Sequence, residues 1–138
     1  MSDGKFEMVT RSEKPLYGPR KLIVCGFAAD LQDKFLKVLA AAGLQGLAVV
    51  WTAANMADDE IGQLMELPDN TGAGIDSTLP RTIVVAGISE SELHSLMDTC
   101  RAGGMKQALW AVLTTVSEKW SLRQLIAELE SEDKALGE

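Results

Sequence analysis

The stretch PRKLIVCGF, residues 19–27, returns later in the chain as PRTIVVAGI, residues 80–88. Both stretches contain an unbroken apolar run rich in β-branched residues, which is typical of a strand that is covered on both faces. Each run ends near a glycine, and apolar residues with helical spacing follow it. The repeated pattern therefore predicts that a strand followed by a helix occurs twice.

The similarity between the two halves extends beyond these strands. A shift of 61 positions aligns residues 19–43 with residues 80–104 without a gap. A second apolar run then follows in each half, LAVVWT in the first and ALWAVLT in the second, and after it a second helix-like segment. One inserted residue in the second half aligns the ends of these runs, Thr52 and Thr114. Each half is thus predicted to have the order β-α-β-α.

These elements predict an α/β fold, with duplicated β-α-β-α units forming a four-stranded, mostly parallel sheet with flanking helices. The domain spans residues 19–132 and contains two repeats, residues 19–67 and 80–132. The connector PDNTGAGIDSTLP between them is long enough for an antiparallel junction, so a mixed, ferredoxin-like sheet is the alternative. Outside the domain we expect a flexible N-terminal arm, residues 1–18, and an acidic C-terminal tail, residues 133–138.

The charge and hydropathy of the chain exclude two classes of partner. A net charge of −7 over 138 residues, with no compensating basic run, disfavours the phosphate attraction on which nucleic-acid binding depends. No apolar run approaches the roughly 18 residues that a membrane span needs, and the N-terminus has no apolar leader. The sequence therefore predicts a cytoplasmic protein that binds neither nucleic acid nor a membrane.

The second half carries further structural motifs. Its first strand ends near Gly87, its second strand ends at Thr114, and Trp120-Ser121-Leu122 begins a helix that closes with Leu129 to Glu132. In these features it resembles the small bacterial and archaeal family of uncharacterised proteins catalogued as DUF3783. The resemblance implies the fold of this half, with the family's domain present here as a tandem repeat, and implies no reaction.

The sequence lacks a nucleophile–base pair, a metal-ligand cluster and a phosphate-binding spacing. We therefore predict no catalytic residue, no metal site and no cofactor. Cys25 and Cys100 lie in apolar segments, where a free cysteine usually acts as a small buried hydrophobe. His94 lies between apolar helix positions and is interpreted as a surface residue.

Polar side chains follow the predicted strands. In a parallel sheet, ligands bind beyond the carboxyl ends of the strands, close to helix N-termini that favour anions. The alternative is that these side chains only cap helices or bond to the backbone. The candidate ligand-binding residues are Thr52, Asn55, Ser89, Thr114, Thr115 and Ser117.

The function predicted first is a non-enzymatic module that binds a small ligand or another protein, because the duplicated shape suits pseudo-symmetric binding. One alternative is a small enzyme that uses Cys25 or Cys100 as a nucleophile at the carboxyl edge of the sheet. Another is an oligomeric structural or accessory protein that docks through Trp120 and the last helix. The partner expected is accordingly a small molecule or a protein, with a homodimer among the options.

Overall fold

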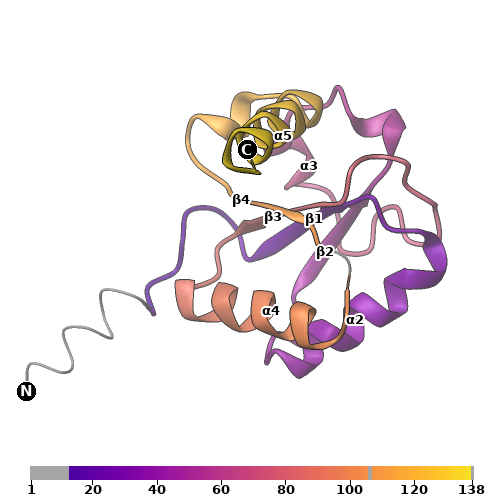
Figure 1. Ribbon diagram of the computed structural model, residues 1–138, viewed down its shortest axis with the longest axis vertical. Coiled ribbons are helices and arrows are strands. Elements are labelled where there is room, and N and C mark those ends of the chain that lie inside the picture. Colours follow the sequence, from indigo (N-terminus) through magenta and orange to yellow (C-terminus); the bar gives the residue numbers. More distant parts are fainter. Residues whose placement is uncertain (1–12, 106, 138) are drawn as a thin grey trace, which may run out of the picture.

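The computed structural model describes residues 13–105 and 107–137 of the chain. A four-stranded sheet with the order β2-β1-β3-β4 forms its centre (Figure 1). Both outer pairs, β1–β2 and β3–β4, are parallel, and the central pair β1–β3 is antiparallel. This confirms the α/β class and the mostly parallel sheet, and it makes the junction between the halves antiparallel. The strands are β1 (Lys21–Cys25), β2 (Ala48–Thr52), β3 (Thr82–Ala86) and β4 (Leu109–Val112).

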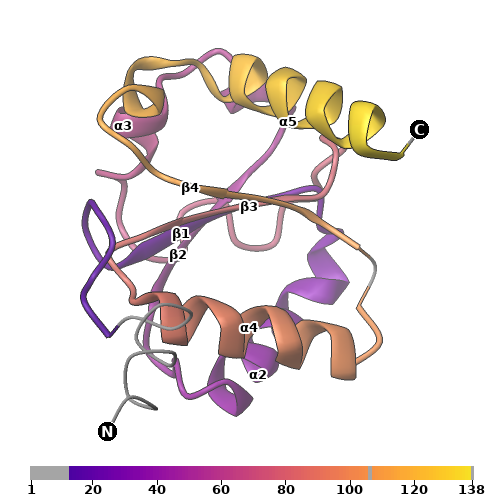
Figure 2. The ribbon, with the colours of Figure 1, turned by 60° about the vertical axis from the view of Figure 1, so that its left-hand side comes forward.

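Helices cover both faces of the sheet. Figures 1 and 2 show α2 and α4 on one face, with α3 and α5 on the other. Within the described residues, no helix combines the length and the apolarity that crossing a membrane requires. The α-helices are α2 (Gln32–Ala41), α3 (Ile61–Leu64), α4 (Glu90–Ala102) and α5 (Leu122–Gly137), and the 3-10 helices are η1 (Ala29–Leu31), η2 (Ala54–Met56) and η3 (Ser117–Lys119).

The antiparallel junction has a twofold register. Ile23 pairs with Val84, which lies 61 positions further along the chain. On the face of α3 and α5, the N–H of residue 61 donates to the carbonyl of residue 120, and the N–H of residue 122 donates to the carbonyl of residue 59, both at 3.0 Å. The two donors, residues 61 and 122, are 61 positions apart, and so are the two acceptors, residues 59 and 120. We therefore call two residues that are 61 positions apart counterparts.

The strand registers correct the alignment of the second strands. Lys21 pairs with Ala48, and their counterparts Thr82 and Leu109 pair in the same way. The shift of 61 thus holds through β2 and β4 without an inserted residue. The counterpart of Thr52 is Leu113, and Thr114 lies one position beyond it.

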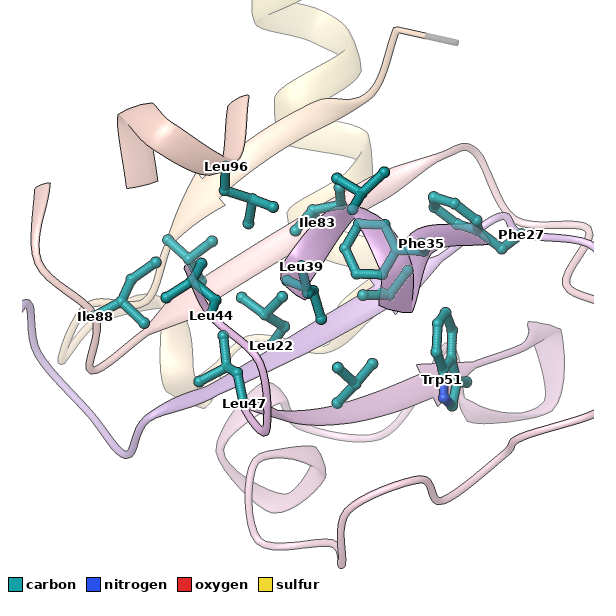
Figure 3. Packing of buried hydrophobic residues seen from close by; sticks show 14 residues of the cluster. Leu22, Phe27, Phe35, Leu39, Leu44, Leu47, Trp51, Ile83, Ile88 and Leu96 are labelled. Carbon is teal, nitrogen blue, oxygen red and sulfur yellow. The ribbon is translucent and has the colours of Figure 1, made fainter. Parts of the chain in front are cut away.

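The sheet separates two hydrophobic cores, because alternate residues of each strand face opposite sides. One core lies beneath α2 and α4 and contains the rings of Phe27, Phe35 and Trp51 in edge-to-face contact (Figure 3). The other lies beneath α3 and α5 and includes Ile23 and Leu122. Burial on both faces explains why β1, β2 and β3 read as unbroken apolar runs, whereas β4 at the edge of the sheet is half-buried and ends at the exposed Val112.

The connector between the halves is built onto the sheet. Asn70 donates its N–H to the carbonyl of Val49, and the N–H of Trp51 donates to the carbonyl of Thr71. The connector therefore covers the outer edge of β2. Gly72 is required here, since its φ is +83° and an added Cβ would overlap the carbonyl oxygen of Trp51.

The structure extends past the expected domain boundaries at both ends. Residues 1–12 of the expected arm lie outside the described residues, whereas Leu16 donates its N–H to the carbonyl of Ile88 and the carbonyl of Tyr17 accepts from Gly87. The end of the arm is thus attached beyond β3. At the other terminus, α5 continues to Gly137, so the expected tail begins as helix.

Candidate functional site

The six candidate residues do not form one site. Because the β1–β3 pair is antiparallel, the carboxyl ends of β1 and β2 lie at one end of the sheet, and those of β3 and β4 lie at the other. Thr52 and Asn55 therefore lie at the opposite end from the rest of the set, which comprises Ser89, Thr114, Thr115 and Ser117. The single polar edge expected for a parallel sheet is absent from the described structure.

The residues at the end of β2 have different environments. Thr52 is buried, donates its hydroxyl to the carbonyl of Val24 at 3.2 Å, and contacts the Cys25 thiol at 2.9 Å. Asn55 is exposed in η2. The hydroxyl of Thr52 is thus turned into the protein and is not presented to a ligand.

Side chains of the connector accept the backbone N–H groups that follow β1. The N–H of Gly26 donates to the Ser77 hydroxyl at 2.9 Å, and the N–H of Ala29 donates to the Asp76 carboxylate at 2.7 Å. Both acceptors belong to the connector, whose sequence NTGAGIDST resembles a phosphate cradle only in composition. Asp76 supplies the negative charge that an anion would bring to this end of the sheet.

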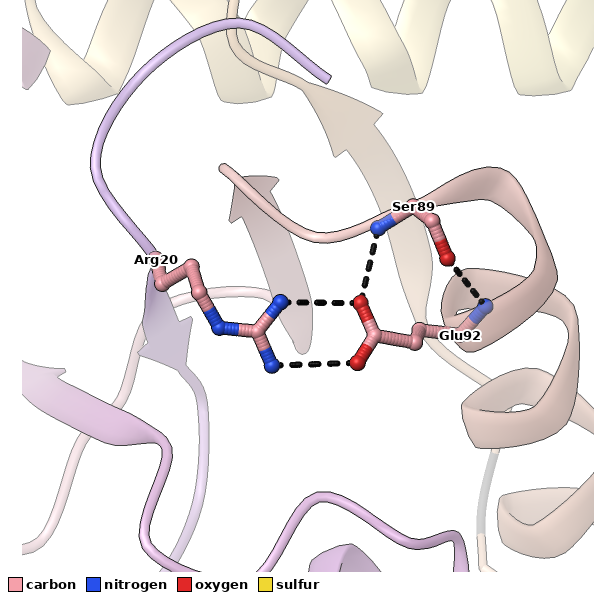
Figure 4. A network of polar contacts seen from close by, with 3 residues as sticks. All are labelled: Arg20, Ser89 and Glu92. Atoms are coloured by element: carbon pink, nitrogen blue, oxygen red, sulfur yellow. Dashed lines mark hydrogen bonds and ion pairs between the residues drawn. The ribbon is translucent and has the colours of Figure 1, made fainter. Parts of the chain in front are cut away.

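The residues beyond β3 and β4 make local polar contacts. Ser89 caps α4 in a reciprocal capping box with Glu92 (Figure 4). The hydroxyls of Thr114 and Ser117 lie 3.0 Å apart, and each accepts the backbone N–H of the other residue. Thr115 is exposed. These contacts are the capping and backbone bonding that formed the alternative interpretation of the sequence.

Trp120 is half-buried and packs against the core beneath α3 and α5. Its carbonyl accepts the N–H of Ile61, one of the two twofold-related bonds. Trp120 therefore contributes to the packing of α3 against α5, and its role as an interface anchor stays a prediction.

A pocket elsewhere in the molecule offers a better site. It has a volume of about 420 Å³ and lies between the second half of α4 and the first residues of β3 and β4. We call it the α4 pocket. Apolar and sulfur-containing side chains form most of its wall, with two arginines among them. The lining residues are Phe27, Arg81, Ile83, Met97, Cys100, Arg101, Met105, Gln107, Ala108 and Trp110.

Arg81 is the central polar group of this pocket. Its guanidinium lies over the ring of Phe27, 4.1 Å from the ring centre, which favours a cation. Partial burial lowers the pKa of Arg81, and the nearby Cys100 thiol has the opposite, weaker effect. Arg101, the second arginine, is exposed and pairs with Asp98 at 3.2 Å. Arg81 is thus the positive charge that faces the apolar wall.

Sequence reasoning missed the α4 pocket because its residues fit no motif. The signal lay in the comparison of counterparts. Leu39 and Leu47 in the first half correspond to Cys100 and Ala108 in the second, so two large side chains are replaced by smaller ones at positions that line the pocket.

The described residues contain no group of three or more histidine, cysteine, aspartate or glutamate side chains that could hold a metal ion. His94 is half-buried in α4. The thiol of Cys25 is buried, and its burial raises the pKa to about 11. Burial also raises the pKa of Cys100, against a smaller lowering effect of Arg81.

Comparison with protein families confirms the resemblance of the second half. Residues 81–136 match the family model described as domain of unknown function DUF3783. Neither the curated proteins nor the solved structures gave a match. The match includes most of the α4 pocket, and the tandem repeat of this domain stays a prediction.

Proposed function

We propose that this protein is a non-enzymatic module that binds a small apolar molecule in the α4 pocket. Ligand sites in proteins are typically concave, about 300–1,000 Å³ in volume, and mostly apolar with a few polar groups. The α4 pocket has this size and composition, with Ile83, Met97 and Trp110 on its apolar wall and Arg81 as a polar group. A protein partner, a homodimer and a cytoplasmic location remain predictions from the sequence.

The observation that carries the proposal is the difference between the two halves. In the first half, the side chains of Leu39 and Leu47 are only 2% and 9% exposed. Their counterparts in the second half are Cys100 and Ala108. A groove of about 430 Å³ runs along the outside of these leucines, but no strand residue lines it. The smaller counterparts in the second half let the α4 pocket reach Ile83 and Trp110 on the sheet.

The thiols give little support to the alternative of a cysteine enzyme. A cysteine nucleophile needs a thiolate at neutral pH, which a depressed pKa provides. Burial instead raises the pKa of both Cys25 and Cys100. Both cysteines are free, as suits the reducing cytoplasm.

The proposal is tested with phenylbutanol, a neutral probe with an apolar body that is small enough for the α4 pocket. A ligand that binds only the folded protein stabilises it by about 1.4 kcal/mol at ten times its Kd, so the melting temperature should rise. Alkylation of Cys100, followed by mass spectrometry, locates the binding. Bound phenylbutanol should slow the alkylation, since Cys100 lines the pocket.

The matched variants are Ala108→Leu and Ala40→Leu. The first places the side chain of the counterpart Leu47 into the pocket and should abolish the thermal shift and the protection of Cys100. The second adds the same atoms at an exposed position on α2 and should change neither. A thermal shift that survives Ala108→Leu would place the probe elsewhere and refute the proposal.

A further inference from the structure

The two arginines at the starts of β1 and β3 are counterparts with different partners. Arg20 donates from Nη1 and Nη2 to the two carboxylate oxygens of Glu92, at 2.9 and 3.0 Å (Figure 4). The same carboxylate accepts the N–H of Ser89 at 2.8 Å, which fixes its position at the start of α4. This paired, two-point contact is the strongest form of arginine–carboxylate recognition.

Arg81, the counterpart of Arg20, has no carboxylate at the place that corresponds to Glu92. The counterpart of Glu92 is Leu31, an apolar residue that packs against the core beneath α2 and α4. The counterpart of Ser89 is Ala28, which caps η1 without a side-chain bond. Within residues 13–105 and 107–137, no carboxylate lies within ion-pair distance of Arg81, whose guanidinium instead stacks on Phe27.

The surroundings of Arg81 favour an anion from outside. Burial disfavours the charged form of Arg81. A carboxylate that accepts hydrogen bonds from two of its N–H groups would offset that cost. Glu130 and Asp133 on α5 line a separate groove that also reaches Arg81. On the side of the α4 pocket, the only other charged lining residue that the structure describes is Arg101, so the described wall carries positive charge.

We infer that the ligand of the α4 pocket is a monocarboxylate with an apolar body, an inference that rests on the proposed function. Its carboxylate is held by Arg81 in the way that the carboxylate of Glu92 is held by Arg20. The apolar body lies against Ile83, Met97 and Trp110. The Arg20–Glu92 pair, shown in Figure 4, is the model for this inferred contact between Arg81 and the ligand.

The test compares three probes with one skeleton: phenylbutyrate, phenylbutanol and phenylbutanamide. Calorimetric titration at neutral pH should give phenylbutyrate a Kd at least tenfold lower than either neutral probe. Arg81→Gln should raise the Kd of phenylbutyrate at least tenfold and leave that of phenylbutanol unchanged. Arg81→Lys keeps the charge without the paired N–H groups and should give an intermediate loss. Arg20→Gln is the matched control and should change neither Kd.

A second variant supplies the missing carboxylate from within the chain. Ala28→Ser with Leu31→Glu recreates the capping box of Ser89 and Glu92 at the counterpart positions. It should remove the preference for phenylbutyrate by occupying Arg81, whereas Ala28→Ser with Leu31→Gln, which has the same shape without the charge, should keep it. These variants also show whether loss of binding in Arg81→Gln reflects charge or a disturbed fold.

The outcomes separate the two proposals. Equal affinity for the acid and the alcohol, with no effect of Arg81→Gln, would overturn the carboxylate inference and leave the apolar pocket intact. If none of the three probes binds, the proposed function falls and the inference falls with it. Preference for the acid that persists in Arg81→Gln would refute the assignment of Arg81.

Discussion

Filling the α4 pocket with the side chain that its counterpart already carries should stabilise the protein. Ala108 is half-buried at the pocket, and its counterpart Leu47 is 9% exposed against α2. Ala108→Leu places three additional carbon atoms where the wall now leaves space. Because the backbone at position 47 accommodates leucine in the same register, we expect the variant to fold without rearrangement of β4.

The magnitude follows from the burial of those three carbon atoms. Complete burial would contribute about 0.8 kcal/mol for each, or roughly 2.4 kcal/mol. Ala108 is half-buried, so about half of that is realised, and fixing the leucine rotamer costs about 0.5 kcal/mol. The free energy of unfolding should therefore rise by about 0.7 kcal/mol, which corresponds to an increase of about 2 °C in Tm for a domain of this size.

Urea unfolding, followed by tryptophan fluorescence, measures this difference. The slope against urea should stay constant, and the midpoint should rise. The reverse substitution, Leu47→Ala, opens the equivalent space in the first half and should cost about 2 kcal/mol, near the lower end for a buried leucine. If Ala108→Leu instead lost more than about 1 kcal/mol through overpacking, the space attributed to the pocket would not exist.

Three further outcomes follow from the polar contacts. Thr52→Val removes the hydroxyl bond to the carbonyl of Val24 and should cost about 1 kcal/mol in urea unfolding; no loss would contradict a structural role for this hydroxyl. Iodoacetamide at pH 8 should alkylate Cys100 in the native protein and leave the buried thiol of Cys25, whose pKa is raised to about 11, unmodified; mass spectrometry distinguishes the two. The bond to Arg20 lowers the pKa of Glu92, so its contribution is present above the ordinary glutamate pKa of about 4.3 and is lost as the pH falls through the lower value in the folded state. Glu92→Gln should accordingly be less stable than the natural chain at pH 7 and approach it in stability below about pH 4, and a difference that is independent of pH would contradict this account.

The four strands, and the burial of β1, β2 and β3, could be predicted from the sequence, because a strand covered on both faces leaves an unbroken apolar run. The apolar run of β4 did not indicate that this edge strand is only half-buried. The orientation of β3 against β1 could not. The connector between the halves can span either geometry, and only the backbone pairing, with Ile23 opposite Val84, decides between them. The predicted ligand site failed to assemble for this reason, since its residues follow strands that end at opposite sides of the sheet.

A second error came from matching residue types instead of faces. Aligning Thr52 with Thr114 joins two identical residues, but alternate strand residues point to opposite faces. Thr52 is buried beside Cys25, which faces the core beneath α3 and α5, and Leu113 belongs to that same core. Matching the residues by the face of the sheet on which they lie pairs Thr52 with Leu113. Leucine has no hydroxyl, so this alignment predicts no site built from paired hydroxyls.

Residues that are 61 positions apart occupy equivalent places in the two halves. Places where these counterparts differ in size and in charge lie at the α4 pocket, where we propose the ligand site. Cys100 and Ala108 reduce the packing that Leu39 and Leu47 provide in the first half, which by itself costs stability. Glu92 pairs its carboxylate with Arg20, but its counterpart Leu31 has no carboxylate to pair with Arg81. The half-buried guanidinium of Arg81 therefore lacks the equivalent ion pair. Both departures adjoin one pocket, and a single molecule with an apolar body and a carboxylate would offset both costs at once.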